Sequence, residues 1–185
     1  MLTLLARLWL AVWRWRVVPP AEPLPDQCVM IASPHTSNWD FPITLASARI
    51  VGVRIQWLGK AALFRGPMGP IMRKLGGISI DRSAANGMVA ALAAEFDRHD
   101  RLVLVVPVEG TRSRGEYWKS GFYRIAQQAD VPIACAYVDR TTRTTGFGAV
   151  LRPTGDVRAD MDVIRATYDG KVGLKPTGTT APRLR

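Results

Sequence analysis

The sequence has few of the residues that cross-link small proteins or bind metals: only two cysteines and two histidines occur among its 185 residues. Cys28 and Cys135 both lie in apolar runs, and neither has the spacing of a metal ligand. We therefore expect two small buried thiols, which argues against a disulfide-rich secreted fold. His99 lies among charged residues, where a solvated side chain is expected, so His35 is the histidine of interest.

The chain also lacks the run of about 20 apolar residues that a membrane-spanning helix needs. The nearest candidate is segment 1–18, and Arg7 interrupts it. A secretory signal would carry its cations first and end in small residues, whereas here the arginines come late and no such cleavage site follows. We expect neither a spanning helix nor a signal peptide.

Segment 1–18 has instead the pattern of an amphipathic helix. At about 100° per residue, Thr3, Arg7 and Arg14 fall on one side, with Leu10 beside them. The opposite broad face collects Leu2, Leu4, Leu5, Leu8, Trp9, Val12, Trp13 and Trp15. The pattern predicts a helix lying in a membrane interface, with indole rings at headgroup depth and arginines near lipid phosphates. The alternative is a helix whose apolar face packs on the protein core.

Acidic residues are scarce relative to basic ones. The 25 lysines and arginines outnumber the 15 aspartates and glutamates, which gives a formal net charge of +10. This excess predicts attraction to polyanions, among them nucleic acid, anionic lipid and phosphorylated substrates. The cations are scattered, and the sequence has neither zinc-finger spacing nor an aromatic RNA-binding signature. We therefore expect no nucleic-acid partner.

The rest of the chain reads as a single α/β domain in which helices cover a mixed β-sheet. Segment 19–27 is a Pro-rich linker, segment 28–170 forms the domain, and segment 171–185 is expected to be a basic flexible tail. Apolar runs predict strands at 28–33, 53–58, 78–80, 102–106, 131–138 and 147–151. Helices are expected at about 40–50, 67–76, 85–99, 118–129 and 160–168.

His35 and Asp40 follow the first expected strand of the domain, separated by four residues. Five residues along a regular helix rotate a side chain by about 140° net, so the two side chains would not meet on one helix. They meet only if His35 lies on the loop after the strand and Asp40 on the first helical turn, where Pro42 is tolerated. The carboxylate would then orient the imidazole as a base. The alternative is that Asp40 caps the helix and His35 is an ordinary loop residue.

Two later segments supply cations and a tight turn. Segment 109–114 follows the strand at 102–106: Gly110 permits a tight turn, Arg112 and Arg114 suit phosphate oxygens, and Glu109 suits an arginine or a hydroxyl. Lys60 and Arg82 add charge after two other strands, where α/β sites gather their ligands. Taken alone, each of these cations is as readily explained by a solvated surface.

These segments together resemble the glycerolipid acyltransferases of the 1-acylglycerol-3-phosphate acyltransferase superfamily. His35 and Asp40 match the family's His-x4-Asp motif, and the stretch from Gly59 to Arg82 matches its Gly-Lys, Leu-Phe, Gly-Pro and Gly-Gly-Ile-x-Ile-Asp-Arg motif. Segment 109–113 matches Glu-Gly-Thr-Arg-Ser, and segment 131–133 matches Val-Pro-Ile. All four motifs occur in order over about residues 28–138.

The resemblance implies transfer of a fatty acyl group from acyl-CoA or acyl carrier protein to the free hydroxyl of a lysophospholipid, above all 1-acyl-sn-glycerol-3-phosphate. His35 would be the general base and Asp40 its partner; the substrate-binding residues would be Lys60, Arg82, Glu109, Gly110, Thr111 and Arg112. No cofactor or metal is required. The protein would act peripherally at the cytoplasmic face of the membrane. The alternatives are another acceptor (a lyso-ornithine lipid, another lysophospholipid or a glycolipid) or a catalytically silent basic membrane-binding protein.

Overall fold

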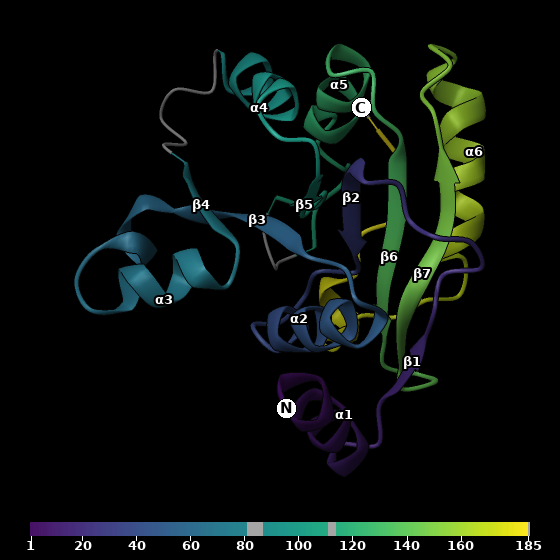
Figure 1. The fold of residues 1–185 in the computed structure, drawn as a ribbon. Helices are drawn as coiled ribbons and strands as arrows, with labels where there is room; N and C mark the ends of the chain where they lie inside the picture. Colours follow the sequence, from purple (N-terminus) through teal and green to yellow (C-terminus); the bar gives the residue numbers. More distant parts are fainter. Residues whose placement is uncertain (81–86, 111–113, 185) are drawn as a thin grey trace.

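The computed structural model describes residues 1–80, 87–110 and 114–184, and its centre is a seven-stranded sheet in the order β1-β7-β6-β2-β5-β3-β4 (Figure 1). The strands are β1 Arg16–Val18, β2 Gln27–Ser33, β3 Ile55–Lys60, β4 Gly77–Ile80, β5 Leu102–Val106, β6 Ile133–Asp139 and β7 Thr144–Leu151. The strands β6, β2, β5, β3 and β4 are parallel, whereas β7 runs antiparallel to β6 and β1 parallel to β7. The expected mixed sheet of an α/β domain is confirmed.

Helices cover both faces of this sheet. They are α1 Leu2–Val12, α2 Asp40–Val51, α3 Met68–Lys74, α4 Met88–Asp97, α5 Gly121–Gln128 and α6 Val157–Tyr168, with short 3-10 helices η1 Ala61–Phe64 and η2 Pro176–Gly178. The larger core lies between the sheet and α4, α5 and α6 and includes Val29 and Ile31 of β2. The smaller core lies on the α2 side and includes Cys28 and Met30. Successive residues of a strand face opposite sides, so the uninterrupted apolar run of β2 fits burial on both.

The amphipathic helix expected over 1–18 is shorter than predicted. Helix α1 ends at Val12, and Arg16–Val18 forms the edge strand β1 beside β7. Arg14 takes a positive φ of 59°, and Arg143 donates a hydrogen bond to the carbonyl of Trp13, which turns the chain toward β7. Helical periodicity alone missed this strand because its pairing partner lies more than 120 residues later in the sequence.

The helix α1 packs on the domain through its narrow side. Leu10, expected beside the arginines, is 1% exposed and packs with Ile43 of α2 and Val138 of β6. Most of the broad apolar face points outward, with Leu2, Leu4, Leu5, Leu8, Val12 and Trp13 exposed, whereas Trp9 and Trp15 are half-buried against this cluster. Figure 1 shows α1 below α2, at the end of the molecule toward which β2 runs. The alternative of packing through the broad face is therefore not what the structure shows.

The flexible tail expected over 171–185 also differs from the structure, in which the described residues 171–184 pack against the domain. The backbone N–H of Lys175 donates to Thr36 Oγ1 at 3.0 Å, and that of Val172 donates to Asp139 Oδ1 at 3.2 Å. The indole of Trp118 donates to the carbonyl of Thr180. The basic Gly- and Thr-rich composition hid these contacts, which depend on polar groups far away in the sequence.

Candidate active site

The strand order places three of the predicted site residues at the carboxyl ends of neighbouring strands. His35 follows β2, Glu109 follows β5, and Lys60 ends β3. These strands are parallel and consecutive in the order β2-β5-β3, so their carboxyl ends lie side by side. Ligands in open α/β sheets bind at this edge.

His35 and Asp40 meet at the loop-to-helix junction that their spacing requires. Asp40 is the first residue of α2, and its Oδ2 lies 3.4 Å from His35 Nδ1. The same oxygen accepts hydrogen bonds of 2.7 Å from the backbone N–H groups of Thr36 and Ser37. The carboxylate, which is 3% exposed, thus holds the loop that carries His35. No side-chain hydrogen bond caps α2, so the helix-cap alternative for Asp40 is not seen.

Glu109 lies behind this loop. Its Oε1 accepts hydrogen bonds from Ser33 Oγ at 2.6 Å and from the backbone N–H of His35 at 3.0 Å. Glu109 is 2% exposed, and its other oxygen is buried and makes no hydrogen bond in the described structure. Burial raises the pKa of the carboxyl above its ordinary value, although the hydrogen bonds from Ser33 and His35 lower it.

The structure describes only two of the other residues predicted to bind the substrate, Lys60 and Gly110. Lys60 is exposed at the end of β3 and begins the turn into η1. Gly110 takes a positive φ of 70°, as a tight turn requires, and its N–H donates to the carbonyl of Pro107 at 3.3 Å. Arg82, Thr111 and Arg112 lie outside the described residues.

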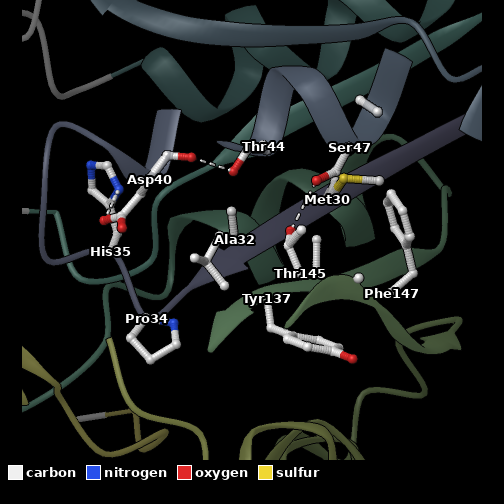
Figure 2. Close-up of a pocket in the computed structure, with 14 residues that line it drawn as sticks. Met30, Ala32, Pro34, His35, Asp40, Thr44, Ser47, Tyr137, Thr145 and Phe147 are labelled. Carbon is white, nitrogen blue, oxygen red and sulfur yellow. Dashed lines mark hydrogen bonds and ion pairs between the residues drawn. The ribbon is translucent and has the colours of Figure 1, made fainter. Parts of the chain in front are cut away.

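A narrow slot runs from His35 and Asp40 between α2 and the strands β2, β6 and β7, as Figure 2 shows. Its enclosed volume is only about 20 Å³, roughly the space that one water molecule needs. Its walls are mostly apolar, with Met30 and Phe147 toward the far end. Ser47 Oγ and Thr145 Oγ1 lie 3.1 Å apart across it and bond to each other. Each of the two hydroxyl groups thus has a hydrogen-bond partner within the apolar wall.

Several residues of the site carry no sequence signal that singled them out. Ser33 and Thr36 are buried and hold Glu109 and the C-terminal segment in place. The slot residues Tyr137 and Phe147 come from β6 and β7, more than 100 residues after His35. Only the strand order β7-β6-β2 brings them together, and a single sequence does not reveal that order.

Groups elsewhere in the domain are structural. Both cysteines are fully buried, as expected, and burial raises the pKa of each thiol to about 12. Such thiols are poor nucleophiles. Among the described residues, no three His, Cys, Asp or Glu side chains gather as metal ligands would. Within the same residues, no helix has the length and hydropathy needed to cross a bilayer.

Comparisons with known proteins identify the family and the fold of the chain. The family model described as "Acyltransferase" matches residues 17–139, which include His35, Asp40 and Glu109. Among solved structures, the chain resembles the crystal structure of the 1-acyl-sn-glycerophosphate (LPA) acyltransferase PlsC from Thermotoga maritima, with a TM-score of 0.65. The match covers 91% of this chain and 77% of that one at 16% sequence identity, so it shows a shared fold. No curated protein matches the sequence.

Proposed function

Because the chain belongs to the acyltransferase family, we propose that it moves a fatty acyl group from acyl-CoA or acyl carrier protein to a lysophospholipid hydroxyl. The acceptor we favour is 1-acyl-sn-glycerol-3-phosphate, which would give phosphatidic acid. The observation that carries this proposal is the pairing of His35 with the buried carboxylate of Asp40 at the mouth of an apolar slot. A partly exposed imidazole beside an apolar slot suits acyl transfer to a hydroxyl.

In this mechanism His35 is the general base. Its Nδ1 faces Asp40, so Nε2 is free to take the proton of the acceptor hydroxyl. The hydroxyl oxygen attacks the thioester carbonyl carbon, the tetrahedral intermediate collapses, and the carbon–sulfur bond breaks. The imidazolium returns its proton to the departing thiolate. Asp40 stabilises the imidazolium, and its distance of 3.4 Å from Nδ1 would shorten once substrate is bound.

Phosphate recognition in the proposal falls to the cations at the same edge. Lys60 is exposed at the end of β3, two strands away from β2, and would bind the phosphate of an acceptor beside His35. Arg82 and Arg112 would add to this charge by virtue of their place in the family motifs. Gly110 and Thr111 would shape the turn beside them. Glu109, which is buried, would act on the substrate only through the His35 loop.

The acyl chain of the thioester would lie in the slot beneath α2. Its apolar walls favour methylene groups over water, by about 0.8 kcal/mol for each CH₂ buried. The carbonyl would then lie at the mouth, beside His35, and the chain would point toward Phe147. The slot encloses only about 20 Å³, so its side chains, among them the bonded pair Ser47 and Thr145, would have to move apart to admit the chain.

The outward apolar face of α1 supports a peripheral membrane location, which we place at the cytoplasmic face. Its exposed leucines and Trp13 lie beside Arg7 and Arg14, a combination typical of interfacial helices. The lysolipid acceptor would then already be concentrated at the same surface. Deleting 1–12 should reduce sedimentation with anionic vesicles; unchanged sedimentation would argue against this role for α1.

The proposal is tested by a turnover panel of the purified protein. Acyl-CoA and acyl carrier protein donors are each paired with lysophosphatidate, lysophosphatidylcholine, a lyso-ornithine lipid and a glycolipid acceptor. We expect the highest kcat/KM with lysophosphatidate. A higher kcat/KM with an acceptor that lacks the phosphate monoester would show that lysophosphatidate is not the preferred acceptor. Absence of acyl transfer with every donor–acceptor pair would contradict the proposed activity.

A further inference from the structure

The lobe formed by η1 and α3 has an apolar surface that the described part of the domain does not cover. Ile71 and Leu75 are 50% and 40% exposed, and Leu63 and Met68 are exposed to a similar degree. Single exposed apolar residues are normal, but four within 13 residues of one lobe form a patch. Figure 1 shows this lobe projecting beyond the β3–β4 edge of the sheet.

A series of aromatic rings leads from this lobe toward α1. The ring of Trp57 lies 5.9 Å from that of Phe64 in η1 and 4.6 Å from that of Phe41 in α2. At the other end, Trp39 lies 6.3 Å from Trp13 after α1. Trp39 and Phe41 flank Asp40 in the sequence, and Trp39 is 59% exposed. Trp39, directly before Asp40, thus contacts the end of α1, and Phe41, directly after Asp40, is linked to the lobe through Trp57.

The charged side chains of segment 41–80, which includes the lobe, are all basic. No aspartate or glutamate occurs between residues 41 and 80, whereas Arg49, Arg54, Lys60, Arg65, Arg73 and Lys74 do. Arg73 and Lys74 lie in the last turn of α3, and the guanidinium of Arg73 lies over the Phe64 ring. Exposed apolar side chains beside cations, with no anion between them, complement an anionic lipid surface.

We propose that the η1–α3 lobe is a second contact with an anionic membrane, in addition to α1, and that the two contacts place the mouth of the site against the bilayer. This inference rests on the proposed function, since it explains how a lysolipid reaches His35 without leaving the membrane. A protein partner, such as an acidic carrier protein, is the competing occupant. The lipid surface fits better because the exposed apolar residues are spread over separate elements, α1 and the η1–α3 lobe, with the exposed indole of Trp39 beside Trp13.

The test measures the partition of the full chain onto phosphatidylcholine vesicles with and without phosphatidylglycerol. The variant Ile71→Ser/Leu75→Ser should bind the anionic vesicles about tenfold more weakly, because two partly exposed apolar side chains no longer enter the interface. Arg73→Gln/Lys74→Gln should weaken binding roughly fivefold or more at low salt, and less at high salt. The matched control is Val157→Ser/Val163→Ser on α6, whose valines are 41% and 47% exposed.

Each outcome has a defined meaning. Loss of vesicle binding in both lobe variants, with melting temperatures close to that of the control, supports the second contact. Binding equal to that of the control variant overturns it, as does weakened binding to acyl carrier protein with unchanged vesicle binding. His35→Ala separates the two proposals: it should keep vesicle binding and lose turnover. If it keeps turnover, the proposed catalytic function fails while the membrane contact stands.

Discussion

Glu109 Oε1 accepts a hydrogen bond of 3.0 Å from the backbone N–H of His35, which joins the turn after β5 to the loop that carries the proposed base. The same oxygen accepts a hydrogen bond from Ser33 at the end of β2. Glu109 therefore positions the loop through the N–H of His35, whereas Asp40 holds it through the N–H groups of Thr36 and Ser37. We therefore predict that Glu109 acts through His35, and not by binding the substrate as the family resemblance implies.

Two substitutions of Glu109 should distinguish the effect of its hydrogen bonds from the effect of its charge. Glu109→Gln keeps an oxygen acceptor for Ser33 and His35, so kcat should fall only modestly. Glu109→Ala leaves both buried donors without a partner, which costs about 1–3 kcal/mol of stability, and kcat should fall further. Steady-state turnover and urea unfolding of both variants check this. Equal kcat values for the two variants would contradict a positioning role.

The raised pKa of Glu109 also predicts a pH dependence of stability. Because the folded-state pKa lies above the ordinary value, the contribution to stability is full below that value and is lost as pH rises through the raised pKa. Glu109→Gln removes this loss. The difference in unfolding free energy, variant minus wild type, should therefore grow as pH rises above the ordinary pKa of a glutamate. Urea unfolding at a series of pH values measures it, and a difference that shrinks with pH would contradict the assignment.

Asp40→Asn should lower kcat by roughly 10²- to 10⁴-fold, because the imidazolium would lose its charged partner. The asparagine keeps one oxygen for the N–H groups of Thr36 and Ser37, so the loop should stay folded. The control is Asp160→Asn, which removes a buried carboxylate bonded to Tyr123 and Thr154, away from the site. It should cost stability but leave kcat per folded molecule near wild type.

The chain-length preference of the enzyme should follow the far end of the slot. Phe147→Leu would lengthen the space beyond Met30 and shift kcat/KM toward longer acyl thioesters. Phe122→Leu makes the same change in the core on the other face of the sheet, outside the slot, and should leave the preference unchanged. A series of acyl-CoA lengths measures both variants. The same shift in both would show that the slot does not hold the chain.

The C-terminal segment should influence catalysis through Thr36. A Cβ added at Gly173 would lie 2.5 Å from Thr36 Cγ2, so Gly173→Ala should displace the His35 loop and lower kcat. Adding Thr36→Ala removes both Cγ2 and Oγ1, which would lie 2.5 and 2.6 Å from the added Cβ, and should restore part of the activity. Gly121→Ala meets nothing within 4 Å and serves as the control. If the second substitution gives no rescue, the loss comes from somewhere other than this contact.

The sequence predicts those parts of the site that depend on local chemistry. The loop-to-helix junction of His35 and Asp40 follows from their spacing and from Pro42, and the bounds of β5 follow from an apolar run between Arg101 and Pro107. The bond from His35 to Glu109 and the walls of the slot depend on the order of the strands, which no local pattern reveals. Strand β1 was missed for the same reason, since its pairing with β7 overrides a helical pattern.

The most direct test of the account compares the two histidines. His35→Ala should reduce acyl transfer from acyl-CoA to lysophosphatidate by roughly 10²- to 10⁴-fold, the contribution typical of a general base. His99→Ala, which removes a half-exposed histidine near Glu95, should leave the rate near wild type. Turnover of folded His35→Ala equal to that of His99→Ala would contradict the assignment of His35 as the base.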